Sequence, residues 1–153
     1  MNDAIPFNVA SAQQAAQIGK LEEWVHAYLN TGHWANPALS EGLKLQKRWW
    51  RGPLELPLTE IHRCVGPEPG MEYLVSEVYW EGRIQPMADS ILAAGLTAYD
   101  LPPFIVEYGK EFSIRDGNHR CGAFERLGWK TAWVLIWYDR ESDYLTDCER
   151  GKK

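Results

Sequence analysis

The stretch 112–128 contains the residues that could take part in chemistry, grouped around the dipeptide Asp116-Gly117. Before this dipeptide the residues alternate between apolar and polar, as in a strand, and after it an apolar stripe runs to Gly128, as in a helix. At the start of such a helix, unpaired backbone N–H groups and the positive end of the helix dipole favour an anion. His119 and Arg120 add side-chain donors in the first turn. The pattern therefore predicts a site that suits a phosphate group.

A second interpretation of the same residues is purely structural. Asp116 would cap the helix, Gly117 would supply a permissive backbone, and His119 and Arg120 would be solvated surface residues. Only some helix N-termini bind anions, so the residues of this turn leave both interpretations open.

The turn needs a sheet to hold it, and the sequence predicts three further strand segments. Residues 104–107 and 111–115 are separated by Tyr108-Gly-Lys110 and are expected to form a hairpin. Residues 131–138 are almost continuously apolar and aromatic, which is typical of a strand covered on both faces. Alternating leucines from residue 54, interrupted by proline, indicate a short edge strand.

Two helices are predicted in the N-terminal third of the chain. Apolar residues recur at helical intervals over 12–29, and Ser11 and Gln14 have the spacing of a capping box. A second helix is expected from Ser40 to about Trp50, with Gly52-Pro53 as its stop signal. Its basic residues would form a solvated side or, together with the neighbouring tryptophans, contact an anionic partner; they are Lys44, Lys47, Arg48 and Arg51.

Two more helices are predicted in the middle of the chain. Over 71–82 the spacing of apolar residues is closer to that of a helix than to that of a strand. From Pro86 to Gly95 the segment has proline in its first turn and glycine just past its end, which is the favoured arrangement for a short helix.

Length and composition indicate one soluble domain. The chain has 153 residues, of which 45% are hydrophobic and 24% charged. The net charge of −5 disfavours sequence-independent binding to nucleic acid, which depends on many phosphate contacts. No apolar run approaches the length of a membrane span, and the first residues lack the basic flank and apolar centre of a signal peptide. We therefore expect a cytoplasmic protein with no membrane contact.

Cysteine and histidine give no indication of a metal site. The three cysteines are far apart in the sequence and are expected to be reduced thiols. The pair His62-x-Cys64 supplies two ligands where zinc requires four, so we expect no metal bound by the protein alone.

Four segments, in this order, resemble the ParB/sulfiredoxin superfamily. Its ParB-type domains carry an S-I-x-x-x-G helix, a P-x-x-V strand and a G-x-x-R-x-x-A signature, and the match covers roughly residues 54–138. The matching segments are Leu58-Thr-Glu-Ile61, Met87-Ala-Asp-Ser-Ile-Leu-Ala-Ala-Gly95, Pro103-Phe-Ile-Val106 and Asp116-Gly-Asn-His-Arg-x-x-Ala123. The resemblance implies an α+β fold with a small mixed sheet flanked by helices. Residues 1–53 would be a helical appendage packed on this core, and residues 139–153 a C-terminal tail.

The resemblance also implies which residues form the site, because in that superfamily the glycine turn and the following helix bind nucleotide phosphates. Arg120 is the strongest candidate for a phosphate ligand, since its planar, permanently charged fork suits phosphate oxygens. His119 could donate a hydrogen bond or transfer a proton. The full set of expected nucleotide-binding residues is Gly117, Asn118, His119, Arg120, Arg115 and Ser90.

Two departures from the family narrow the expected chemistry. Sulfiredoxins have a cysteine where this chain has Asn118, and asparagine cannot act as a thiolate, so a sulfinic-acid reductase is not expected. About 15 residues follow the matched segment, too few for the DNA-binding and dimerisation regions of full ParB proteins. The Asp-Gly-Asn-His-Arg turn is more similar to that of small stand-alone members of the superfamily, which include a serine kinase.

The first hypothesis is a nucleotide-binding protein that acts as an NTPase or a small-molecule phosphotransferase on ATP, ADP or CTP, with Mg²⁺ assisting. His119, Asp116 and Glu60 are the expected catalytic residues. Glu77 and Glu81 are further candidates for the base, because the sequence does not distinguish among its carboxylates.

The second hypothesis is a non-catalytic interaction or regulatory module that docks a protein partner through its Trp-rich N-terminal helices. Such a module could also be associated with DNA. Alternatively, those tryptophans cover the sheet. A nuclease is disfavoured by the acidic charge and by the lack of clustered carboxylates.

Overall fold

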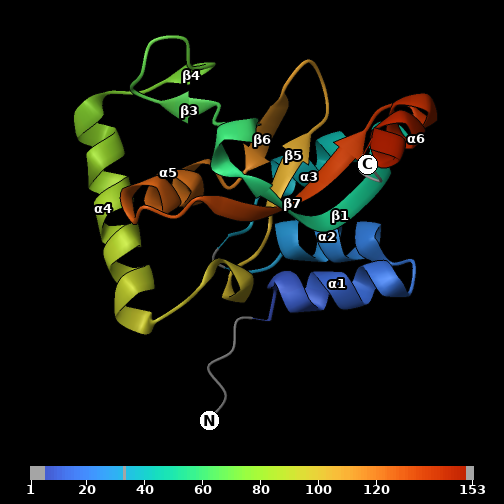
Figure 1. The fold of residues 1–153 in the computed structure, drawn as a ribbon, viewed down its shortest axis with the longest axis horizontal. Helices are drawn as coiled ribbons and strands as arrows, with labels where there is room; N and C mark the ends of the chain where they lie inside the picture. The colour runs from blue at the N-terminus through green and yellow to red at the C-terminus, as the bar shows by residue number, and fades with distance from the viewer. Residues whose placement is uncertain (1–5, 33, 151–153) are drawn as a thin grey trace.

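The computed structural model describes residues 6–32 and 34–150, which form a five-stranded mixed sheet with helices on both faces (Figure 1). The strand order is β1-β7-β5-β6-β2. β7 pairs antiparallel with β1 and parallel with β5, and β6 pairs antiparallel with β5 and parallel with β2. The strands are β1 (Trp49–Pro57), β2 (Ile61–His62), β5 (Phe104–Glu107), β6 (Phe112–Asp116) and β7 (Thr131–Tyr138). The predicted α+β class, the β5–β6 hairpin and the edge position of the strand that contains residues 54–57 are confirmed.

Both faces of the central strands are buried, as the apolar sequence of 131–138 predicted. Along β7, Val134 and Ile136 point into one core, whereas Leu135 and Trp137 point into the other. The first core lies under α4 (Glu77–Ala94) and α5 (Asn118–Arg126), and the second under α1 (Val9–Gln17), α2 (Leu21–Leu29) and α3 (Pro37–Leu43). The N-terminal helices are therefore the cover of one face of the sheet.

The single helix predicted over 12–29 is in fact two helices. Gly19 has a φ of 72°, which breaks the chain between α1 and α2. The capping box is also one turn earlier than predicted, because Asn8 is the N-cap and Ser11 is its partner at the third helical position. The apolar spacing continued across the break because both helices pack on the same core.

The helix predicted from Ser40 to Trp50 is wrong in its second half. Asn36 caps α3, which ends at Leu43, and the chain then enters β1 at Trp49. Gly52-Pro53, predicted as a stop signal, lies within β1 at a shift of register between Arg51 and Leu54. Pairing with β7 overrides the local helical pattern here. The expected boundary at residues 53/54 consequently falls inside a strand.

The two helices predicted between residues 71 and 95 are a single helix, α4, which begins only at Glu77. β4 (Tyr73–Leu74) pairs with β3 (Val65–Gly66) in a small parallel sheet, and Ser76 then caps α4. Pro86 lies inside α4, so the prediction that it begins a helix is wrong. The predicted end is confirmed, because Gly95 is the C-cap in the left-handed conformation.

The segment expected to be a C-terminal tail contains a helix, α6 (Glu141–Arg150), which packs on β1 and β7. Asp147 of α6 is buried, accepts a hydrogen bond from the Tyr138 hydroxyl and pairs with Arg51 at 3.2 Å. Within the described residues no helix has both the length and the apolar character to cross a membrane.

Candidate functional site

The helix N-terminus predicted as an anion site is present and has no side-chain cap. β6 ends at Asp116, and Gly117 is the N-cap of α5 with a φ of 114° and no side-chain capping bond. A Cβ atom at Gly117 would lie 2.6 Å from Cδ1 of Phe104, so the close approach of strand and turn requires glycine. The structural interpretation, in which Asp116 caps this helix, is therefore wrong on that point, because the N-cap is Gly117. Within the described part of the chain, the N–H groups of the first turn therefore have no side-chain capping acceptor.

This N-terminus opens into a cavity of about 800 Å³ between α4 and α5, here called the α4–α5 cavity. One wall is α4 from Gly82 to Ala94, a length of about 18 Å at the usual helical rise. Six of the predicted site residues line this cavity: Ser90, Asp116, Gly117, Asn118, His119 and Arg120. The remaining walls come from Trp34, Leu96 and Leu101.

Arg120 lies in the cavity wall, but its guanidinium is already bound on several sides. It donates to the carbonyl oxygen of Pro102, to the Tyr28 hydroxyl at 2.8 Å and to the Asp116 carboxylate at 3.0 Å. The side chain is only 2% exposed. Tyr28 also donates to Asp116, at 2.7 Å, so that α2, β6 and α5 meet at this point. Burial and the charge of Asp116 raise the pKa of Tyr28, which keeps its hydroxyl protonated as a donor.

Asn118 has a structural contact through each side-chain group. Its amide oxygen accepts from the backbone N–H of Cys64 at 2.7 Å, and its amide nitrogen donates to the carbonyl of Ile114 at 3.1 Å. The side chain thus fixes the turn to the strand before it, and only the backbone N–H of Asn118 is left for a ligand.

His119 has the properties of a neutral base at the cavity wall. Its ring packs on Trp80 with 5.4 Å between centroids, and its Nε2 atom is buried without a hydrogen-bond partner among the described residues. Burial lowers the pKa of His119, and the charges of Arg83 and Arg63 lower it further. The imidazole is therefore neutral near pH 7 and able to accept a proton.

Arg83 is a candidate that the sequence analysis missed. It lines the α4–α5 cavity, is exposed, and has no ion-pair partner among the described residues; its guanidinium lies 4.9 Å from the centroid of the Tyr79 ring. Arg83 precedes Ser90 by seven residues, which places both on the same face of a helix. That signal was hidden because the helix was predicted to begin at Pro86.

Two predicted site residues lie outside the α4–α5 cavity lining. Glu60 is exposed on a short 3₁₀ turn, η1 (Leu58–Glu60). Arg115 forms ion pairs of 2.9 Å with Glu107 and with Glu72, which link β6 to β5 and to the segment before β4. The structure thus brings neither residue to the helix N-terminus.

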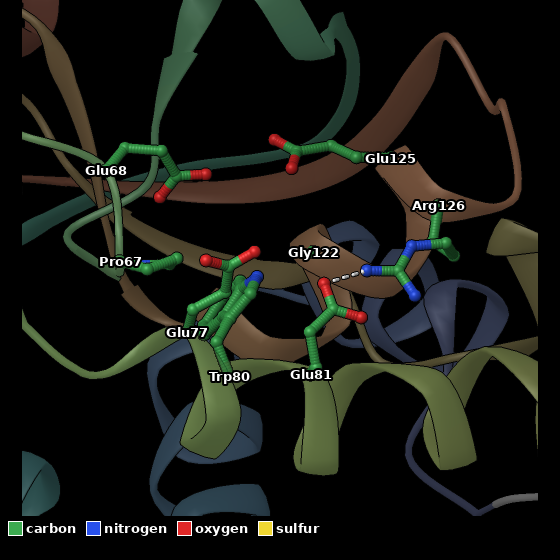
Figure 2. Close-up of a pocket in the computed structure, with 8 residues that line it drawn as sticks. All are labelled: Pro67, Glu68, Glu77, Trp80, Glu81, Gly122, Glu125 and Arg126. Atoms are coloured by element: carbon green, nitrogen blue, oxygen red, sulfur yellow. Dashed lines mark hydrogen bonds and ion pairs between the residues drawn. The ribbon is translucent and has the colours of Figure 1, made fainter.

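Glu77 and Glu81, the other carboxylates considered as bases, line a different cavity of about 490 Å³, shown in Figure 2. This acidic cavity also contains Glu68 and Glu125, and Arg126 pairs with Glu81 at 2.5 Å. The neighbouring rings of Trp80 and His119, tilted by 31° to each other, lie where the two cavities approach each other, because Trp80 lines the acidic cavity and His119 the α4–α5 cavity.

The cysteines agree with the prediction of reduced thiols. All three are free, and Cys64 and Cys121 are buried. Burial and the neighbouring Glu125 raise the pKa of the Cys121 thiol to about 12, which makes it a poor source of thiolate.

Comparison with known proteins gives structural matches alone. No protein-family model matches the chain, and no curated protein does. Similar solved structures include a conserved hypothetical protein from Pyrococcus furiosus, at 20% identity and a TM-score of 0.40, and a free serine kinase in complex with AMP, at 19% identity and a TM-score of 0.40. Both matches cover 54% of this chain, and they span 31% and 30%, respectively, of the other chain's length.

A sulfiredoxin from Arabidopsis thaliana is also similar, at 27% identity and a TM-score of 0.39 over 54% of this chain and 81% of the sulfiredoxin.

Proposed function

We propose that this protein binds a nucleotide in the α4–α5 cavity, with the phosphates at the N-terminus of α5, and transfers or hydrolyses a phosphoryl group. The observation that carries the proposal is an uncapped helix N-terminus that faces a cavity of nucleotide size, next to an arginine without an ion-pair partner among the described residues. The Asp-Gly-Asn-His-Arg motif, which resembles the phosphate-binding turn of the ParB/sulfiredoxin superfamily, gives independent support.

The charge balance of the cavity supports an anionic ligand. Among the described residues, Asp116 is the one acidic residue of its lining, and the carboxylate is paired with Arg120. Arg83 then leaves an excess positive charge, to which the dipole of α5 adds. Phosphate oxygens would accept from the first-turn N–H groups and from Arg83.

His119 is the proposed proton acceptor. A neutral imidazole whose buried Nε2 atom has no hydrogen-bond partner among the described residues can take the proton from an attacking hydroxyl or water as the terminal phosphoryl group is transferred. Asp116 would act indirectly, by orienting Arg120, because its Oδ2 atom already accepts from Tyr28 and Arg120. Glu60 has no place in this arrangement.

Mg²⁺ fits this site only as a companion of the nucleotide. Among residues 6–32 and 34–150 there is no group of three or more His, Cys, Asp or Glu side chains that could hold a metal ion. The nucleotide phosphates and water would supply most of its ligands.

Calorimetric titration with ADP, ATP and CTP tests the binding step. We expect binding by the wild type, and at least a tenfold loss of affinity in Arg83→Ala, because one charge-assisted phosphate contact contributes about 1.5–3 kcal/mol. Arg140→Ala is the matched control, since Arg140 is 76% exposed and outside the cavity. Absence of binding at millimolar nucleotide would refute the proposal.

Phosphoryl transfer is tested separately from binding. Conversion of ATP to ADP should be lost in His119→Gln while ADP binding persists, because glutamine keeps a hydrogen-bonding group but cannot take up the proton. Equal rates of ATP conversion in the wild type and in His119→Gln would mean that His119 has no catalytic role, although the protein binds a nucleotide.

The alternative of docking through N-terminal tryptophans has weaker support. Trp24, Trp34 and Trp50 pack against the second core, with Trp24 buried within it. The larger exposed apolar side chains near one another in sequence are instead Tyr73, Leu74, Val78 and Tyr79, at β4 and the start of α4.

A further inference from the structure

The two ends of the α4–α5 cavity differ in chemistry. At one end, Arg83 and His119 are grouped by their contacts with Tyr79 and Trp80, in the first half of α4. At the other end lie apolar side chains and the indole of Trp34. This apolar part of the lining comprises Met87, Ile91, Ala94, Leu96, Leu101 and Trp34.

Contacts of Arg120 fix the place of Trp34 at the apolar end. The centroid of the Trp34 ring lies 4.9 Å from the Arg120 guanidinium carbon, and the same guanidinium donates to Pro102, the neighbour of Leu101. A cation held over an aromatic face by other hydrogen bonds restricts the position of the ring. Trp34 is thus a positioned aromatic wall supplied by the N-terminal layer.

The cavity is long enough for a nucleotide, because its α4 wall from Gly82 to Ala94 is about 18 Å long. Trp34 lies within reach of a base whose phosphates are at the N-terminus of α5, because Arg120 contacts both places: its Nη2 atom lies 3.3 Å from the Cβ position of Gly117, and its guanidinium carbon lies 4.9 Å from the Trp34 ring centroid. Aromatic side chains bind nucleobases by stacking, which tolerates different bases because every base has a π-face.

We infer that Trp34 is a ligand-binding residue that stacks against the nucleobase and makes the site selective for nucleotides over simple phosphates. This inference rests on the proposed function. It assigns the N-terminal helical layer a direct part in recognition, in addition to its packing on the sheet. The phosphate end alone would bind pyrophosphate, and Trp34 would add affinity for the nucleoside.

Paired titrations with ADP and inorganic pyrophosphate test the inference, because both ligands have two phosphates and one of them lacks the nucleoside. In Trp34→Ala, we expect the affinity for ADP to fall by roughly tenfold to a hundredfold while the affinity for pyrophosphate stays within about twofold. Trp34→Phe retains an aromatic face and should keep most of the ADP affinity. Thermal unfolding of each variant establishes that it is folded.

The outcomes separate the inference from the proposed function. Equal losses for both ligands would mean that Trp34 acts through Arg120 or through the fold, which overturns the inference. Unchanged ADP affinity in Trp34→Ala also overturns it. If the wild type binds pyrophosphate and ADP equally well, the protein has a phosphate site without a base site, which overturns the inference but not phosphate binding. A wild type that binds neither ligand refutes the proposed function and the inference together.

Discussion

Arg120 shows how a residue that sequence motifs associate with ligand binding can also hold a fold together. Its side chain is nearly inaccessible and bonds groups from α2, from the segment before β5 and from the end of β6. A substitution at this position therefore changes both the site and the stability of the protein.

We predict that Arg120→Ala lowers the free energy of unfolding by about 3–5 kcal/mol, because Asp116 is left in a largely buried position without its cation. Chemical denaturation followed by circular dichroism measures this. Arg126→Ala is the control, since its ion pair with Glu81 is partly exposed and should contribute about 1 kcal/mol or less. Similar losses in the two variants would contradict the structural role of Arg120.

We predict that the pKa of His119 lies below the ordinary histidine value of 6.5 and rises in Arg83→Ala, because one of the charges that lower it is removed. NMR titration of the imidazole proton measures the pKa, with the spectrum of His119→Gln giving the assignment. Arg83→Lys keeps the charge and should leave the pKa nearly unchanged. Equal pKa values in the wild type and Arg83→Ala would rule out the coupling.

The same shift affects stability with a defined sign. The unfolded chain binds a proton at His119 at a higher pH than the folded chain does. The contribution of neutral His119 to the free energy of unfolding is therefore fully present above the ordinary histidine pKa of 6.5. It is lost as the pH falls from 6.5 toward the lower pKa of His119 in the folded protein.

Sequence reasoning identified the residues of the turn but not their bonding. The spacing of Asp116 to Arg120 after an alternating segment was enough to place a helix N-terminus there. The hydroxyl that joins Asp116 to Arg120 comes from Tyr28, 88 residues earlier than Asp116, and no local pattern indicates such a contact. Arg83 was missed for a related reason, because Pro86 usually begins a helix and here lies within one.

The sequence did not predict α6, a helix that is held on the sheet by one buried carboxylate. Asp147 accepts from Tyr138 of β7 and pairs with Arg51 of β1, so one carboxylate connects the helix to two strands. Burial and the adjacent carboxylate raise the pKa of Tyr138, which stays a hydrogen-bond donor. The acidic and polar composition after Asp139 concealed this helix, because one buried side chain gives no periodic signal.

We predict that Asp147→Ala lowers the free energy of unfolding by about 2–4 kcal/mol, since the buried Tyr138 hydroxyl loses its acceptor and Arg51 loses its partner. Asp143 lies on the same helix and forms an exposed ion pair with Arg140, just before the helix. Asp143→Ala should therefore change the free energy of unfolding by less than about 1 kcal/mol. Thermal unfolding of the two variants side by side compares them. A larger effect at Asp143 would contradict the anchoring role.

The strands were predicted better than the N-terminal helices. Residues 104–107, 112–115 and 131–138 have short, strongly apolar or alternating patterns, and each is a strand. The start of β1 was predicted as helix because Trp49 and Trp50 continue a helical spacing from the preceding segment. Its strand conformation comes from pairing with β7, about 80 residues later, which a local pattern does not contain.

For the whole molecule, the N-terminal layer is a structural requirement. It covers Ile105, Leu135 and Trp137 on the second face of the sheet. We predict that a chain without residues 1–48, which keeps β1, is aggregated or lacks a cooperative transition. Uncovering several large apolar side chains, at about 1.5–3 kcal/mol each, removes much of the roughly 5–15 kcal/mol that stabilises a domain.

Size-exclusion chromatography and thermal unfolding followed by circular dichroism test this prediction. A monomeric, cooperatively folding 49–153 fragment would instead mean that the core is stable without the N-terminal helices.

The position of β7 has a consequence for biosynthesis. Among the strands of residues 6–32 and 34–150 it comes last in the chain, yet it lies between β1 and β5 and pairs with both. A nascent chain that stops before Thr131 therefore has β1 without a neighbour and no continuous sheet on which the helical layers can assemble. Folding of the core is therefore delayed until residues 131–138 have left the ribosome.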